Sequence, residues 1–329
     1  MPFDIDPKRN LWGIVLAAGG GNRIRHFIEK RYGMDSPKQY VAFTGKRSML
    51  QHTLHRVETL IPSDRTLVVV DPKHGKDIRT QLYERPDNTV IFQPCNRETA
   101  PGVLLPLMHI YKRDPEARVA IFPADHFILE EDRFMAHVSL GDEVVRHHPD
   151  QIVLLGVRAE GPETEYGWIE PGEPLGERFG TRVRRLGHFL EKPDLPAARE
   201  FFRKGFLWNT FVMVAKAETL IELAKAHLPN IWSHFDRILD AIGTNQEHHV
   251  VEAEYRNMER ATLSRGILEK SISRMSVIEI EGVFWSDWGS EERVLATLEK
   301  IGRLPLPFSE EVRPIRVPRP KPEKEKIAI

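Results

Sequence analysis

The sequence is poor in several features that would place it in a simple class. It has one cysteine, Cys95, which excludes an internal disulfide and suits a reducing compartment. No stretch approaches the roughly 20 apolar residues of a membrane span, and no apolar run follows the charges of the first residues. The 47 basic and 48 acidic residues nearly cancel, so the net charge of −1 leaves no electrostatic footprint for nucleic acid. We therefore expect a cytoplasmic protein with no membrane and no nucleic acid among its partners.

Several motifs of well-known chemistries are also missing. There is no GxSxG turn and no context for a cysteine nucleophile, so covalent acyl chemistry has no support. The pairs His147-His148 and His248-His249 are adjacent and point apart on a helix or a strand, and neither forms a zinc site. The GGGNRI segment lacks the last glycine of the dinucleotide fingerprint, and no Gly-Lys-Ser/Thr follows it as in a P-loop.

The chain is organised around the run Leu11–Phe27, LWGIVLAAGGGNRIRHF. It reads as a buried strand over 11–16 that enters a loop with three glycines, followed by Arg23 and Arg25. A loop so poor in side chains lets backbone N–H groups close on an anion, and the arginines can add positive charge. A tight strand-to-helix turn would need the same glycines, so this stretch alone leaves both interpretations open.

Strand-like apolar runs alternate with helix-like segments through the first half of the chain. This pattern predicts an α/β fold, a doubly wound and mostly parallel sheet with helices on both faces. Residues 158–190 are rich in glycine, proline and charge, which favours an antiparallel excursion over one end of the sheet. Further helices are expected after it, one of them over about 246–261. Strands are expected at 11–16, 66–70, 89–92, 118–122, 151–157 and 275–280.

The composition changes at Pro305, and from there to the end six prolines and many charged residues leave little apolar content. Such a segment cannot bury enough apolar surface to form a packed element. We therefore expect one domain over residues 1–304 and a mobile tail over 305–329.

Two acidic residues follow apolar strands. Asp125 follows the strand RVAIFPA, and Asp287 lies in WSDWGSEERV. Ligands of open α/β sheets bind at the carboxyl edge, where such residues gather. A turn or helix-cap role explains each aspartate alone, but two carboxylates beside a phosphate-binding loop are what Mg²⁺-dependent phosphate chemistry requires.

Four other polar residues occupy unusual contexts. Lys38 in SPKQY and Lys192 in LEKPD each lie beside a proline, and a lysine is a common point-charge partner of phosphate, although most lysines are only solvated. Glu191 and Asn209 interrupt apolar, aromatic strands. They can bind a ligand hydroxyl or serve as satisfied polar groups within the fold.

Eight segments in this order resemble the sugar-1-phosphate nucleotidyltransferases. The resemblance extends over about residues 11–302, and the segment QPCNRETAP before FPADH is typical of the mannose-1-phosphate guanylyltransferase (GDP-mannose pyrophosphorylase) branch. The segments are LAAGGGNR, SPKQY, QPCNRETAP, FPADHFI, YGWIEPG, FLEKP, WNTF and SDWGS.

The resemblance implies a Rossmann-like, GT-A-like nucleotidyltransferase domain. Such a domain transfers a nucleotidyl group from an NTP, here GTP, to a sugar 1-phosphate, here mannose 1-phosphate, and releases pyrophosphate with Mg²⁺ as cofactor. It implies catalytic roles for Arg23, Lys38, Asp125, Lys192 and Asp287, with Asp125 and Asp287 as metal ligands. It implies nucleotide contacts for Ala18, Gly19, Gly20, Gly21, Arg97 and Thr99, and sugar contacts for Gly167, Glu191 and Asn209. The partners are then small-molecule substrates, and a homo-oligomer is compatible with the resemblance.

The sequence departs from the family pattern at several positions. Ala18 replaces the first glycine, Asn22 replaces a threonine, and RHFIEKRYGMDS replaces a Trp-Pro-Leu-Ser type segment. Glu98 stands where an asparagine is common, and Phe211 replaces a glycine. These two positions leave open another NTP and sugar pair. A catalytically silent regulatory subunit that binds a nucleotide sugar is a third alternative, and the retention of Arg23, Lys38, Asp125, Lys192 and Asp287 together is evidence against it.

Overall fold

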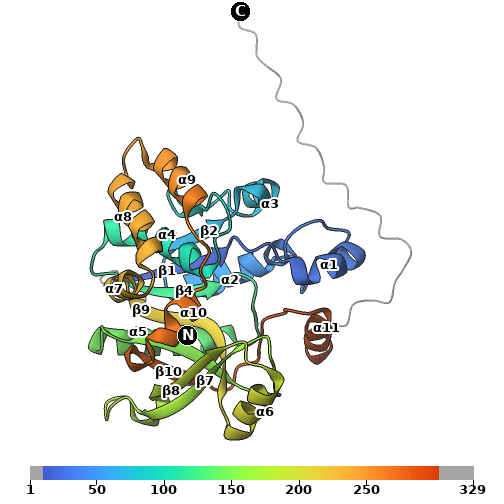
Figure 1. Cartoon of the computed structure of the whole chain (residues 1–329). Helices are drawn as coiled ribbons and strands as arrows, with labels where there is room; N and C mark the ends of the chain where they lie inside the picture. The colour runs from blue at the N-terminus through green and yellow to red at the C-terminus, as the bar shows by residue number, and fades with distance from the viewer. Residues whose placement is uncertain (1–9, 304–329) are drawn as a thin grey trace, which may run out of the picture.

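The computed structural model describes residues 10–303, in which helices cover both faces of a central sheet (Figure 1). This confirms the predicted α/β fold. The predicted tail, 305–329, lies outside the described residues. Within 10–303, no helix is both long and apolar enough to cross a bilayer.

Nine strands form the large sheet in the order β3-β2-β1-β4-β9-β6-β10-β8-β7. Strands β1, β2, β3, β4, β6 and β10 all run in one direction, and β9 runs against them between β4 and β6. Their bounds are β1 (Leu11–Ala17), β2 (Thr66–Val70), β3 (Val90–Phe92), β4 (Arg118–Pro123), β6 (Ile152–Arg158), β7 (Gly167–Pro174), β8 (Val183–Glu191), β9 (Leu207–Lys216) and β10 (Met275–Ile280).

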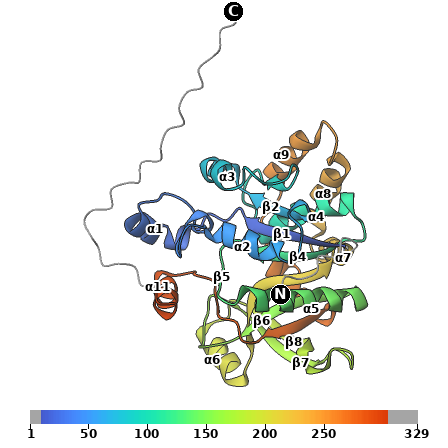
Figure 2. The same ribbon diagram turned by 180° about the vertical axis from the view of Figure 1, so that it is seen from behind.

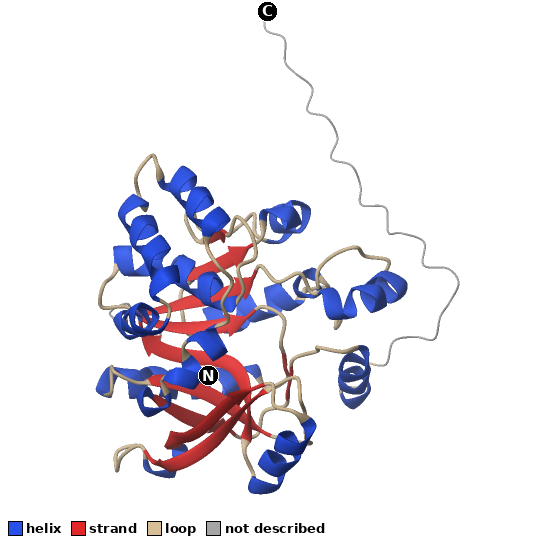
Figure 3. Ribbon diagram, in the orientation of Figure 1, coloured by secondary structure: helices blue, strands red, loops and turns tan. Residues whose placement is uncertain are grey.

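The predicted antiparallel excursion is the β7–β8 hairpin. It pairs with β10 through β8 and with the start of β9 through β7. In Figure 3 this hairpin extends from one end of the sheet.

Helices cover both faces of the large sheet. Helices α4, α7 and α8 contact one another on one face, and α2 and α5 lie on the other. The helices are α1 (Arg25–Tyr32), α2 (Met49–Glu58), α3 (Gly75–Gln81), α4 (Thr99–Arg113), α5 (Glu131–His147), α6 (Leu195–Lys204), α7 (Ala217–His227), α8 (Pro229–Ala241), α9 (Glu247–Asn257), α10 (Leu263–Gly266) and α11 (Glu291–Lys300).

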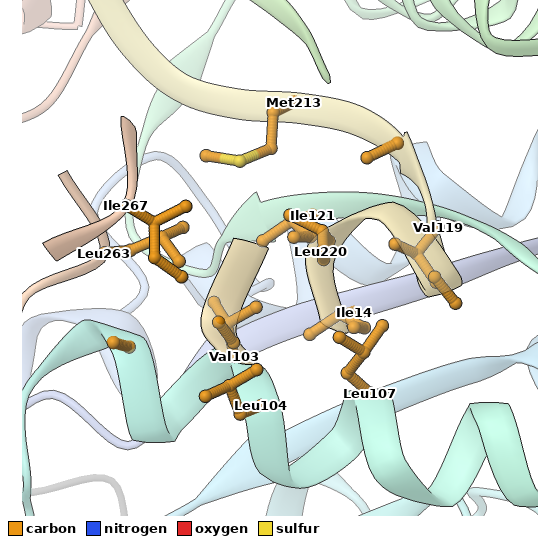
Figure 4. Close-up of a cluster of buried hydrophobic side chains, with 14 of the residues drawn as sticks. Ile14, Val103, Leu104, Leu107, Val119, Ile121, Met213, Leu220, Leu263 and Ile267 are labelled. Carbon is orange, nitrogen blue, oxygen red and sulfur yellow. The ribbon is translucent and has the colours of Figure 1, made fainter. Parts of the chain in front are cut away.

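Strand β1 shows why the sheet needs helices on both faces. Trp12 and Ile14 belong to the core beneath α4 and α7, whereas Val15 and Ala17 belong to the core beneath α2 and α5. This alternation follows from the two-residue period of a strand. Figure 4 shows Ile14 among Val103, Leu107 and Leu220 of the covering helices.

A third, smaller core involves residues 24–36, the stretch that includes the replaced segment RHFIEKRYGMDS. Ile24, Phe27 and Ile28 of this segment are buried against Trp288 and Val294. Helices α1 and α11 accordingly lie side by side in both views (Figures 1 and 2). The segment therefore forms a packed helix of its own, α1. This helix follows the glycine loop and packs against α11.

One predicted boundary was wrong. The helix expected over about 246–261 ends at Asn257, and Met258 adopts an extended conformation. The backbone N–H of Ala261 donates to Arg97 O, and Ala100 N–H donates to Ala261 O. These bonds hold the end of the predicted helix as an extended strand-like segment beside 97–100, because tertiary pairing overrides local propensity.

Candidate active site

The glycine loop leaves the carboxyl end of β1 and turns sharply at Gly21. Gly21 has φ +60°, and a Cβ there would lie 2.7 Å from the backbone nitrogen of Lys38. The Gln39 amide donates to Ala17 O at 2.9 Å and to Gly19 O at 2.7 Å. The 38–40 turn therefore supports one side of the glycine loop. The other side of the loop faces the carboxyl edge of the sheet.

We expect Gly21→Ala to destabilise the protein by at least about 1 kcal/mol, since the methyl group meets a backbone atom and φ is left-handed. Gly19→Ala is the matched control because its Cβ would have no neighbour within 4 Å. Thermal unfolding of the two variants measures the difference, and equal melting temperatures would contradict the bracing role of this turn.

Lys38 is almost fully buried at the centre of the site, with 4% of its surface exposed. Its ammonium lies 2.9 Å from Asp125 Oδ2 and donates to the backbone oxygens of Asp287, at 2.5 Å, and Trp288, at 3.3 Å. One buried cation thus joins the segment after β4 to the segment before α11.

A short antiparallel ribbon brings the two predicted aspartates together. In it β5 (Phe127–Ile128) pairs with β11 (Trp285–Ser286), and Ser286 lies opposite Phe127. Asp125 and Asp287 therefore meet where the two strands of the ribbon approach the sheet. Both carboxylates line one cavity.

Asp287 is held by three donors on one oxygen. Tyr166 Oη–H at 2.8 Å, Gly289 N–H at 2.9 Å and Arg293 Nη1–H at 2.9 Å all donate to Oδ1. Its Oδ2 lies 3.6 Å from Arg23 Nη2. The side chain is fixed through Oδ1, which leaves Oδ2 oriented toward the arginine of the glycine loop.

The electrostatic surroundings keep both aspartates ionised. Burial alone would raise each pKa, but the neighbouring groups outweigh it. Lys38 lowers the pKa of Asp125 most strongly, and His126 in its charged form, then Arg293 and the Tyr166 hydroxyl, lower that of Asp287. The pKa of each carboxyl is therefore lower than its ordinary value. Tyr166 stays protonated, because burial and Asp287 raise its pKa.

His126 lies behind the aspartates as a neutral imidazole. Burial lowers its pKa to about 4. Trp285 Nε1–H donates to His126 Nδ1 at 3.3 Å, so the ring proton is on Nε2, 4.0 Å from Asp125 Oδ1. The ring therefore presents an N–H to Asp125.

The predicted sugar residues meet where β7, β8 and β9 join. Gly167 pairs with Glu191, and Trp168 pairs with Trp208, the neighbour of Asn209. A Cβ at Gly167 would lie 2.7 Å from Glu191 Oε2, so a larger residue would displace that carboxylate. Burial raises the pKa of Glu191 above its ordinary value.

Phe211 lines the same end of the cavity. Its φ of +61° is a left-handed conformation that favours glycine, and its N–H donates to Asn209 Oδ1 at 3.1 Å. The backbone thus keeps a glycine-like shape while the side chain adds a ring to the cavity wall.

The cavity has a volume of about 310 Å³, and most of the predicted site residues line it. Lys38 lies directly behind Asp125 rather than in the wall. The predicted residues that line it are Gly19, Arg23, Thr99, Asp125, Gly167, Glu191, Lys192, Asn209 and Asp287.

Arg97 is turned away from this cavity. Its guanidinium donates to the backbone oxygens of Tyr255 at 2.7 Å and Arg256 at 2.6 Å, and so caps the end of α9. Glu98 is likewise paired with Arg260. Ala18, Gly20 and Gly21 belong to the loop but are not among the cavity's lining residues.

Several residues of the site were missed in the sequence. Three of them are direct neighbours of predicted residues: Gln39 follows Lys38, His126 follows Asp125, and Tyr166 precedes Gly167. Arg293 lies six residues after Asp287 in the quoted segment WSDWGSEERV, on the first turn of α11. The missed residues are Gln39, His126, Glu165, Tyr166, Trp285 and Arg293.

The donor set fits Mg²⁺. Two ionised carboxylates face one cavity, and Mg²⁺ is usually held by one or two carboxylates, with phosphate and water completing the octahedron. Within residues 10–303, no three His, Cys, Asp or Glu side chains are grouped as a complete metal cage. A metal here would therefore complete its coordination with water and with oxygens of a bound phosphate.

Known proteins are similar to this chain in sequence and in architecture. Mannose-1-phosphate guanylyltransferase 2 of Escherichia coli O157:H7 is 27% identical over 292 residues, which cover 84% of this chain and 58% of that protein. The alginate biosynthesis protein AlgA of Pseudomonas fluorescens is 31% identical over 222 residues, 67% of this chain and 44% of that protein. The chain thus spans about half the length of these curated relatives.

A solved structure shows the same fold. The crystal structure described as mannose-1-phosphate geranyltransferase from Thermus thermophilus is 28% identical, with a TM-score of 0.72, and the match covers 89% of this chain and 79% of that one. Residues 12–302 match the family described as Nucleotidyl transferase. The predicted family is confirmed, and the chain belongs to the nucleotidyl transferase family.

Proposed function

We propose that the protein joins an NTP to a sugar 1-phosphate, giving a nucleotide sugar and pyrophosphate. The preferred pair is GTP and mannose 1-phosphate. The observation that carries the proposal is the buried ammonium of Lys38, which joins Asp125 to the backbone of Asp287 beside the glycine loop. Such a cluster suits a reaction between two phosphates, because it concentrates fixed charge at one sheet edge.

The NTP binds with its phosphates against the glycine loop. Gly19 and Arg23 line the cavity on this side, and the backbone N–H groups of the loop act with Arg23 on phosphate oxygens. The Gln39 amide keeps the loop in place through Ala17 O and Gly19 O. Thr99, at the start of α4, lies on the same wall.

The sugar 1-phosphate binds on the opposite wall. Lys192 has φ +53°, a conformation that a non-glycine residue adopts only when the surroundings enforce it, and its N–H donates to Tyr166 O at 3.1 Å. Its ammonium meets the sugar phosphate. Glu191 and Asn209 bind the sugar hydroxyls at the end of the cavity closed by Phe211.

The chemistry needs positioning and charge rather than a covalent group on the enzyme. A phosphate oxygen of the sugar 1-phosphate is already a nucleophile, and it attacks the α-phosphorus in line while the bond to pyrophosphate breaks. Arg23, Lys38 and Lys192 offset the repulsion between the two anions. Asp125 and Asp287 would hold Mg²⁺, which, when bound, neutralises charge on the α-phosphate and the leaving pyrophosphate.

Two similarities favour the mannose and guanine pair. The E. coli relative is named a mannose-1-phosphate guanylyltransferase, and the Thermus structure is also named for mannose 1-phosphate. Phe211 in the cavity wall favours the second candidate, the same reaction with another sugar, because the ring reduces the space beside Asn209.

A panel of four NTPs and several sugar 1-phosphates with Mg²⁺ tests the proposal by pyrophosphate release. We expect the fastest release with GTP and mannose 1-phosphate. Faster release with another pair would identify the second candidate. Binding of GTP without release from any pair would instead support a catalytically silent regulatory subunit and overturn the enzymatic proposal.

A further inference from the structure

Glu165 lies between the two cations that we assign to substrate phosphates. Its Oε2 is 3.4 Å from Arg23 Nη1, on the side of the glycine loop. The same oxygen is 3.6 Å from Lys192 Nζ, on the side of the sugar. A single carboxylate oxygen therefore bridges cations from opposite walls of the cavity.

The position of Glu165 is set by its neighbours. Tyr166 is buried and donates its hydroxyl to Asp287 at 2.8 Å, and its backbone oxygen accepts from Lys192 N–H. On the other side, the Glu163 carboxylate pairs with Arg293. Glu165 is held between two anchored residues, so its side chain projects into the cavity mouth rather than sampling the surface freely.

In this arrangement, a carboxylate of the protein itself occupies a site that is suited to an anion. Arg23 and Lys192 are about half exposed and would repel each other without a shared anion. The carboxylate supplies that anion. A phosphate group carries the same charge with more acceptor oxygens and can take its place.

We propose that Glu165 is a built-in counterion that occupies the phosphate-binding position between Arg23 and Lys192 and is displaced when substrate phosphates bind. The inference rests on the proposed function only in identifying the displacing anions as the phosphates of an NTP and a sugar 1-phosphate. The counterion holds the two walls in register in the free protein. The counterion also lowers the affinity for anionic ligands, because each incoming anion must break an existing ion pair.

The test compares Glu165→Gln with the wild type by isothermal titration calorimetry, using inorganic pyrophosphate and mannose 1-phosphate as separate probes. Exposed ion pairs are individually weak, and the substitution removes two of them, so we expect Kd to fall about three- to tenfold for both probes. The gain should shrink as salt is raised. Glu173→Gln, an exposed residue of β7, makes the same change in net charge and should leave Kd unchanged.

Other outcomes overturn the counterion role. Unchanged or weaker binding of pyrophosphate by Glu165→Gln would show that the pairs do not compete with anions. A loss of affinity for mannose 1-phosphate alone would show that the carboxylate binds the sugar. Tighter binding by the variant in a protein that turns over no substrate pair would reject the proposed function and retain the counterion.

Discussion

Asp287→Asn is expected to lower kcat by about a hundredfold or more, the order expected for loss of a metal ligand. Asparagine keeps the size of the side chain and an oxygen that accepts from Tyr166, Gly289 and Arg293, so the local structure should survive. What disappears is the charge on Oδ2, which faces Arg23. Asp125→Asn should have an effect of the same order, since Asp125 shares the cavity and the contact with Lys38.

Steady-state kinetics at saturating substrates, with Asp64→Asn as the control, measures this effect. Asp64 is exposed and lies before β2, at the opposite edge of the sheet from the cavity, so its variant should match the wild type. A metal-binding isotherm provides a second readout, in which Asp287→Asn should weaken Mg²⁺ binding in the presence of GTP. Near-normal kcat and Mg²⁺ affinity would reject the assignment of Asp287.

Lys38→Met is expected to reduce both activity and stability. The ammonium contacts Asp125 and two backbone oxygens, so methionine leaves a partly buried carboxylate and two carbonyls without their donor. Loss of one member of such a pair should cost about 1–3 kcal/mol of unfolding free energy, because Asp125 retains some solvent. kcat/KM should fall by about a hundredfold or more, since Lys38 fixes the spacing of the two segments that carry Asp125 and Asp287.

Denaturant unfolding and kinetics of Lys38→Met should be compared with those of Lys46→Met. Lys46 is exposed, and its replacement removes the same charge without touching the site. A wild-type midpoint together with wild-type kcat/KM for Lys38→Met would contradict both the stabilising and the catalytic role of Lys38.

Much of the fold follows from local patterns in the sequence. The apolar runs of β1, β2, β4, β6 and β10, alternating with helix-like segments, predict a sheet covered on both faces, and the structure confirms it. The glycines before Arg23 predict a turn. The structure has this turn, in which Gly21 is left-handed and lies close to the backbone nitrogen of Lys38. The turn and the phosphate cradle are therefore compatible interpretations of one loop.

The arrangement of the site required the tertiary structure. The β5–β11 ribbon, two residues on each strand, brings Asp125 and Asp287 together, and strands so short have no periodicity to detect. Arg97 is a different case, because a motif predicts a nucleotide contact and its guanidinium here donates to the last turn of α9. In the sequence, Glu165 looks like an ordinary surface glutamate. Only the fold brings Arg23 and Lys192, which are far apart in the sequence, close to its carboxylate.

The stoichiometry of a single reaction tests the proposed chemistry most directly. Incubation with α-labelled GTP, mannose 1-phosphate and Mg²⁺ should give labelled nucleotide sugar and pyrophosphate in equal amounts, and the yield should fall sharply with Asp287→Asn. Consumption of GTP that gives only GMP or inorganic phosphate, or no consumption with any NTP and sugar 1-phosphate, would contradict a nucleotidyl transfer between the two walls of this cavity.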